Sequence, residues 1–147
     1  MPITIRAGSR LSKIKSAFIK KEQTEQEVRG DMSEKRFEDM VEGLAKNGKL
    51  PWFRGLARAS ATEDWILKID FRMRVVSEGE EGTMEFSIPF QIKSSTRGAE
   101  DFKKANPRSK AHVIIMNVQM REAWLLNILT AAYLSEAEKH NHPAPVK

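Results

Sequence analysis

Cysteine is absent from the 147-residue chain. Its absence excludes disulfide bonds, thiolate ligands for a metal ion and a cysteine nucleophile, and it fits a cytoplasmic protein. Long apolar runs are also missing, since none approaches the ~20 residues of a membrane-spanning helix. Residues 1–6 lack the apolar core of a secretion signal. We therefore expect a cytoplasmic protein with no membrane partner.

Acidic residues are missing from the first 21 positions, and basic residues exceed acidic ones over the whole chain. Lys and Arg number 25 against 20 Asp and Glu, which gives a formal net charge of +5. This balance is compatible with a polyanionic partner, although many basic proteins bind no nucleic acid. The length fits one domain with a substantial core.

The basic stretch at residues 1–32 is interpreted as an N-terminal helical extension that follows Ser9, a suitable N-cap. Its apolar residues recur at helical spacing: Leu11, Ile14 and Phe18. Lys13 and Lys20 are candidate phosphate contacts. The alternative is a solvated helix that packs on the domain or on a second subunit. We favour this alternative slightly, because acidic residues follow from Glu22 onward.

A second helix is predicted to begin at Ser33, another suitable N-cap, and to end at Asn47-Gly48. Its apolar residues follow the spacing of a core-facing helix: Phe37, Met40, Val41 and Leu44. Glu38 lies in the middle of this helix. Without further evidence, a single Glu in such a position is a solvent-facing charge.

Residues 51–61 indicate a short strand with a bulge or bend at Gly55. Arg54 and Arg58 lie on its expected exposed side and are candidate phosphate contacts, although surface arginines are common. Asp64 follows, either as a partner of the site described next or as a turn residue, and we favour the turn.

Two stretches alternate between apolar and polar residues with a period of two, which is typical of strands with one buried face. The apolar sets are Trp65, Leu67, Ile69, Phe71, Met73 and Val75 in the first, and Met84, Phe86, Ile88, Phe90 and Ile92 in the second. The charged, glycine-bearing connection at 77–83 predicts a hairpin. The polar faces of a hairpin coincide, so we expect Asp70 to lie close to Gln91 and Lys93.

The rest of the chain predicts a loop, a short helix at 99–105, a buried strand at 112–118 and a final helix at 121–140. A strand, helix, strand unit predicts that the last strand runs parallel to its predecessor. The final helix is apolar on more than one face. It is therefore deeply buried or shared with another subunit, and a homodimer through this helix or the N-terminal one is an open alternative.

The acid on one strand and the Gln-x-Lys on the next resemble the PD-(D/E)XK, or restriction-endonuclease-like, nuclease superfamily. Asp70 matches the first acid of that pattern and Lys93 its lysine. Gln91 stands where most members carry Asp or Glu, and the run from Gln91 to Ser95 is similar to a Q-x-K-S-S variant. The resemblance implies an α/β fold, an α+β mixed sheet with an αβββαβ core, in a domain at 33–138 with a flexible tail at 139–147.

The resemblance also implies a Mg²⁺- or Mn²⁺-dependent endonuclease that hydrolyses phosphodiester bonds in DNA. The metal ligands would be Asp70, the Gln91 side chain and the Ile92 backbone carbonyl, and Lys93 would assist the attacking water. Glu38 resembles the glutamate that the first core helix of the superfamily often carries to the metal. The remaining nucleic-acid contacts would come from the loop after the strand: Ser94, Ser95 and Arg97.

Three alternatives stay open. Gln91 in place of a carboxylate removes one negative charge, so the same fold could be a catalytically weak or inactive module for nucleic-acid binding or assembly. A more distant alternative is an oligomeric scaffold built on the final helix. At the level of the residues alone, Asp70 could simply form an exposed ion pair with Lys93 or Arg72, which would contribute ~0–1 kcal/mol.

Overall fold

A computed structural model describes residues 30–141 of the chain. The predicted N-terminal extension, with Lys13 and Lys20, and the last residues of the tail lie outside the described residues. The chain divides into two compact units, Met1–Met32 and Ser33–Lys147. The architecture below is that of the second unit.

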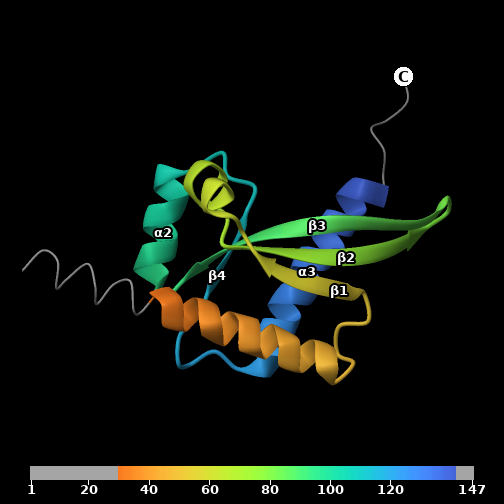
Figure 1. Cartoon of the computed structure of the whole chain (residues 1–147), viewed down its shortest axis with the longest axis horizontal. Coiled ribbons are helices and arrows are strands. Elements are labelled where there is room, and N and C mark those ends of the chain that lie inside the picture. Colours follow the sequence, from red (N-terminus) through yellow and green to blue (C-terminus); the bar gives the residue numbers. More distant parts are fainter. Residues whose placement is uncertain (1–29, 142–147) are drawn as a thin grey trace, which may run out of the picture. The chain divides into compact units, whose positions relative to one another are not determined.

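The described residues form an α+β fold with the order αβββαβα (Figure 1). The elements are a first helix at 30–46, β1 (Phe53–Arg58), β2 (Phe71–Gly79), β3 (Gly82–Lys93), α2 (Thr96–Ala105), β4 (His112–Ile115) and α3 (Glu122–Asn141). The predicted element order is therefore confirmed. Among the described helices, none combines the length and apolar character needed to cross a bilayer.

The four strands form one mixed sheet in the order β1-β2-β3-β4. β1 and β2 are antiparallel, as are β2 and β3, whereas β3 and β4 are parallel. The predicted hairpin and the predicted parallel strand are both confirmed. The register of β1 shifts between Phe53 and Gly55, where a bulge was expected. A Cβ on Gly55 would lie only 3.0 Å from Nη2 of Arg74, so a larger residue there would require the arginine side chain to shift.

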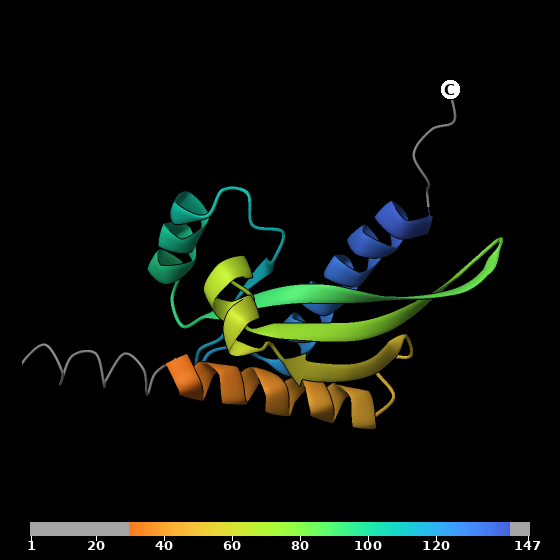
Figure 2. The same ribbon diagram turned by 45° about the horizontal axis from the view of Figure 1, so that its top comes forward.

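The core lies on one face of the sheet, where the apolar positions of β2 and β3 alternate as predicted. Phe37 of the first helix packs against Phe71 and Phe90, with ring centroids 5.1 and 5.6 Å apart. Tyr133 of α3 donates a hydrogen bond of 2.8 Å to the carbonyl of Val76 and stacks against Phe86. Both helices thus pack against the sheet, and Figure 2 shows them running beside its strands.

The start of β2 differs from the prediction. Residues 65–69 do not continue the strand, because Glu63–Leu67 form a π-helical turn, η1. The amide of Glu63 donates to Oγ of Ser60 and the amide of Ser60 donates to Oε1 of Glu63, at 3.1 and 3.2 Å. This reciprocal capping box begins a helical turn. Lys68, in the left-handed region at φ 56°, ends it.

Three helix predictions are also corrected. Residue 30 is already helical, so Ser33 does not start the first helix and is instead buried within it. The helix α2 begins at Thr96, three residues earlier than expected, with Ser95 as its N-cap. The final helix is not buried on all sides, since three of its large apolar residues are exposed: Trp124, Ile128 and Leu134. A homodimer through α3 stays a prediction.

Candidate active site

The candidate site lies where β2 begins and β3 ends. Asp70 immediately precedes β2, and its amide donates a hydrogen bond of 2.8 Å to the carbonyl of Phe90. Its carboxylate Oδ2 accepts a hydrogen bond of 2.7 Å from the amide of Ile92. Backbone and side chain together hold Asp70 against the part of β3 that carries Gln91 and Lys93. The expected proximity of these three residues is observed.

A second carboxylate, Asp64 of η1, adjoins Asp70. The pKa of Asp70 is raised to about 6, chiefly by burial and also by the charge of Asp64 and a side-chain hydrogen bond with it. The hydrogen bond from Ile92 and the charge of Lys93 act in the opposite direction. Asp64 is therefore part of the site rather than a plain turn residue, because η1 folds it back towards the start of β2.

Gln91 is buried, with 7% of its surface exposed. Its carbonyl Oε1 is fully buried and has no hydrogen-bond partner among the described residues. A buried carbonyl oxygen without a partner costs ~1–3 kcal/mol, so natural proteins rarely leave one in this state. Among the described residues, this oxygen is the one buried side-chain nitrogen or oxygen atom without a hydrogen-bond partner.

Lys93 lies with Gln91 in an open hollow of about 540 Å³. The hollow is lined by Asp64, Lys68, Gln91, Lys93, Gly98, Asp101, Phe102 and Asn106. Nζ of Lys93 lies 5.1 Å from the ring centroid of Phe102 on α2, a distance typical of a cation–π contact. No ion pair between described residues involves Lys93, whereas Arg72 pairs with Glu63. The alternative prediction, an exposed ion pair of Asp70 with Lys93 or Arg72, is therefore wrong.

Glu38 lies elsewhere. Its Oε1 is 3.4 Å from Nη2 of Arg58, whose Nη1 lies 3.1 Å from Oε1 of Glu34. Arg58 also covers the ring of Phe71. Glu38 is not among the residues that line the hollow or among the charges that act on Asp70. The structure thus places Glu38 in an ion-pair cluster on the first helix and β1, not with the candidate ligands.

The predicted phosphate contacts are also dispersed. Arg54 donates to the carbonyls of Pro51 and Phe53. Oγ of Ser95 accepts the amide of Gly98 at 3.0 Å as a helix cap. Arg97 lies 4.0 Å from Asp101, and Ser94 is exposed beside it. None of these predicted contacts lines the hollow.

Oxygen donors line the hollow and adjoin it, which suits a hard divalent cation. Asp64, Gln91 and Asp101 line the hollow, and Asp70 lies beside it through its hydrogen bond with Ile92. Asp64, Asp70 and Oε1 of Gln91 offer only oxygen, and Mg²⁺ prefers oxygen ligands while keeping several waters. Among residues 30–141, no three or more His, Cys, Asp or Glu side chains converge on a point. A metal here would therefore have two carboxylates and one amide carbonyl, with Asp64 in the place predicted for Glu38. The backbone carbonyl of Ile92 stays a predicted fourth donor.

Comparison of the chain with protein-family models, with curated proteins and with solved structures finds no match.

Proposed function

We propose that the chain is a metal-dependent nuclease that hydrolyses phosphodiester bonds, with DNA as the expected substrate and a restriction-endonuclease-like core. The observation that carries the proposal is the buried, unpartnered carbonyl of Gln91. Gln91 lines the hollow together with Asp64 and Lys93, and Asp70 adjoins it through the hydrogen bond from the amide of Ile92. A divalent cation would supply the missing partner of that carbonyl and a counter-charge for the neighbouring carboxylates.

The roles of the side chains follow from their chemistry. Asp64, Asp70 and Gln91 would hold Mg²⁺ or Mn²⁺, which when bound supplies an acidified water and withdraws charge from the phosphoryl group. Lys93 donates hydrogen bonds to the attacking water or to the phosphoryl oxygens, where negative charge develops in the transition state. The ammonium group of Lys93 contacts the ring of Phe102, and this contact does not neutralise the positive charge of Lys93.

The element order supports the same proposal. A helix, an antiparallel hairpin, and a parallel strand reached through a second helix place the Asp and the Gln-x-Lys segment at one point of the sheet. The sequence resemblance requires this juxtaposition of two β-strands.

Cleavage assays with supercoiled plasmid and single-stranded DNA test the proposal, in Mg²⁺ and then in Mn²⁺. We expect the native chain to cleave at least one substrate and Lys93→Ala to lose at least ~100-fold in rate. Lys104→Ala is the matched control, because Lys104 is an exposed lysine of α2 that does not line the hollow. No cleavage by the folded native chain in either metal would reject hydrolysis.

A second candidate is a nucleic-acid-binding module on the same fold with little or no catalysis. The observation in its favour is that the described residues contain no group of three or more His, Cys, Asp or Glu side chains that could hold a metal ion. Gln91, an amide, stands where a third carboxylate would complete such a group. This candidate predicts salt-sensitive binding without turnover in either metal. Gln91→Glu would then be the variant to examine, because it restores the missing carboxylate.

A further inference from the structure

A second, larger pocket lies next to the candidate site, between η1, β2 and the loop from α2 to β4. Its volume is about 640 Å³, within the ~300–1,000 Å³ that small-molecule sites occupy. Its apolar lining includes Ile66, Leu67, Pro89 and Pro107. Four basic residues line it as well: Lys68, Arg72, Arg108 and Lys110. No acidic residue lines it.

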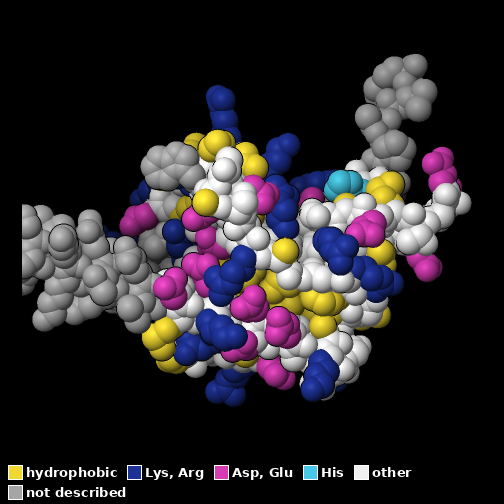
Figure 3. Space-filling model, viewed as in Figure 1, with side chains coloured by type: hydrophobic (Ala, Val, Ile, Leu, Met, Phe, Trp, Pro, Cys, Tyr) yellow, Lys and Arg dark blue, Asp and Glu magenta, His cyan; other side chains and the backbone are white. Residues whose placement is uncertain are grey.

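Two large apolar side chains of the pocket are exposed to solvent. Ile66 and Leu67 are 65% and 48% exposed, although both sit on a turn that a capping box and a left-handed Lys68 fix in place. Large apolar side chains that cluster on a monomer surface mark a binding site more often than chance. Figure 3 shows hydrophobic side chains at the top of the molecule with Lys and Arg side chains around them.

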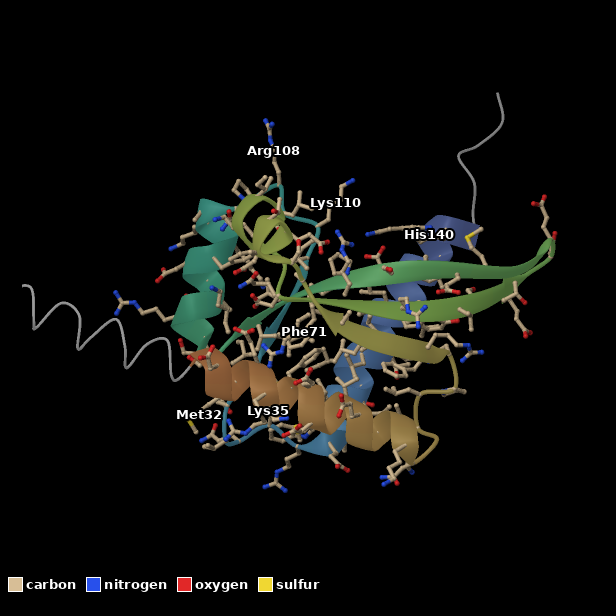
Figure 4. All side chains as sticks on the ribbon, viewed as in Figure 1. Met32, Lys35, Phe71, Arg108, Lys110 and His140 are labelled. Atoms are coloured by element: carbon tan, nitrogen blue, oxygen red, sulfur yellow. The ribbon has the colours of Figure 1, made fainter. Side chains whose placement is uncertain are left out.

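The basic residues leave a net positive charge around this apolar surface. Arg72 is neutralised by its ion pair with Glu63. Neither Arg108 nor Lys110 forms an ion pair with any described residue, and both are exposed. Figure 4 shows the two side chains projecting outward from the loop between α2 and β4. An apolar floor with unneutralised cations at its rim complements a ligand that is flat, apolar on its faces and anionic at its edge.

The pocket and the hollow are neighbours. Lys68 and Asn106 line both. Lys68 adopts φ 56° although it is not glycine, and such strained residues concentrate at functional sites. A chain whose phosphate lies in the hollow could therefore place the neighbouring nucleotide in the pocket.

We propose that this pocket receives one unstacked base of a single-stranded nucleic acid, while Arg108 and Lys110 bind the flanking phosphates. Bases outside a duplex stack on apolar side chains and on arginine. A base within an intact duplex cannot enter without leaving its stack. The proposal rests on the proposed function and narrows its substrate class to single-stranded or locally unpaired nucleic acid.

Fluorescence anisotropy with the full chain tests the proposal, in EDTA so that no cleavage occurs. The probes are labelled dT12, the same length as a duplex, an abasic dT12 that keeps the phosphates, and U12. We expect dT12 to bind about 10-fold more tightly than both the duplex and the abasic chain. Tight binding of U12 with weak binding of dT12 would assign the pocket to RNA and keep the proposal.

Two matched pairs of variants locate the binding. Arg108→Gln/Lys110→Gln should weaken dT12 binding and lower the slope of log K against log salt by about 1.4. Lys103→Gln/Lys104→Gln, the same loss of charge on α2 away from the pocket, should change neither. Ile66→Ala should weaken the binding of dT12 but not the binding of the abasic chain. Ile128→Ala on α3 should weaken the binding of neither.

Equal binding of dT12 and its abasic form, or equal losses in the pocket and control variants, would overturn the proposal. These results are separate from the test of hydrolysis. Base-dependent binding through the pocket without cleavage in Mg²⁺ or Mn²⁺ would remove the catalytic role and keep the pocket. If the chain cleaves nucleic acid but its binding does not change in the Arg108, Lys110 and Ile66 variants, the catalytic role is kept and the role of the pocket is removed.

Discussion

Two polar clusters flank the sheet, and they differ in how completely the protein satisfies them. In the first, Arg58 lies between Glu34 and Glu38 and covers the ring of Phe71. In the second, Asp64 adjoins Asp70, and the carbonyl of the buried Gln91 has no partner among the described residues. The carboxylates of the first cluster are paired with an arginine, whereas the second contains two adjacent carboxylates and a buried carbonyl oxygen without a partner among the described residues.

This difference is the reason why we propose a function for the second cluster and not for the first. Ion pairs such as those of Arg58 contribute ~0–1 kcal/mol and need no ligand. Adjacent carboxylates beside an unpartnered carbonyl destabilise the folded chain, and a protein that keeps them gains nothing unless a cation or substrate binds there. Sequence alone assigned Glu38 to the site, but the pairing of Glu38 with Arg58 removes the reason for that assignment.

The largest effect is expected for catalysis. Asp70→Asn should lower metal-dependent cleavage at least ~100-fold, because it removes an anionic ligand at the reacting centre. Asp39→Asn is the matched control, since Asp39 forms an exposed pair with Lys35 on the first helix. Gel assays of plasmid cleavage at fixed Mn²⁺ measure both rates. Equal rates for the two variants would show that Asp70 has no role in cleavage.

The stability of the metal-free protein should depend on the ionisation of Asp70. Its pKa of about 6 in the folded chain exceeds the ordinary ~3.9 of the unfolded chain. The folded state therefore binds the proton more tightly, and stability is lost as the pH rises from about 4 through 6. Asp70 is only partly buried, so we expect a loss of about 1–2 kcal/mol after solvent screening.

Urea unfolding in EDTA at pH 4.5 and pH 7.5 measures this loss. Asp70→Asn should be more stable than the native chain at pH 7.5, with a smaller difference at pH 4.5. A difference that does not change with pH would mean that Asp70 titrates normally. Added Mn²⁺ should raise the stability of the native chain and leave that of Asp70→Asn nearly unchanged.

Gln91→Leu should separate stability from function. Removing a buried carbonyl without a partner should raise the free energy of unfolding of the metal-free chain by about 1 kcal/mol. The same change should weaken Mn²⁺ binding, because one oxygen donor is lost. Urea unfolding and calorimetric titration measure the two effects. A destabilised Gln91→Leu chain with native metal affinity would show that Gln91 has a purely structural role.

The smallest effect is expected for the ion-pair cluster of Arg58 with Glu34 and Glu38. Glu38→Gln should change the unfolding free energy by less than ~1 kcal/mol, since its partner Arg58 keeps Glu34. Cleavage should stay within about 2-fold of native, because Glu38 does not line the hollow. A large loss of cleavage in this variant would return Glu38 to the metal site, as the sequence had predicted.

Local patterns in the sequence predict much of the fold. Alternation places Phe86, Ile88 and Phe90 on the buried face of β3, and the structure has all three buried. The same rule fails before Phe71. There the apolar residues Trp65, Leu67 and Ile69 also alternate, but the Ser60 and Glu63 capping box forms a helical turn that competes with the strand. That Ser-x-x-Glu pattern was readable in the sequence.

The candidate site is less accessible to sequence reasoning, because its decisive features depend on the tertiary structure. Asp70, Gln91 and Lys93 follow from strand alternation and a hairpin. Asp64 does not, since its position depends on how η1 folds back. No sequence pattern shows that Oε1 of Gln91 lacks a partner, because that is a property of everything packed around it.

The most direct test is X-ray diffraction at the manganese absorption edge from crystals of the full chain grown with Mn²⁺. We predict one strong anomalous peak in the hollow, coordinated by the carboxylates of Asp64 and Asp70 and by Oε1 of Gln91. The absence of a peak at saturating Mn²⁺, with Oε1 of Gln91 hydrogen-bonded to a water or another side chain, would contradict the metal site.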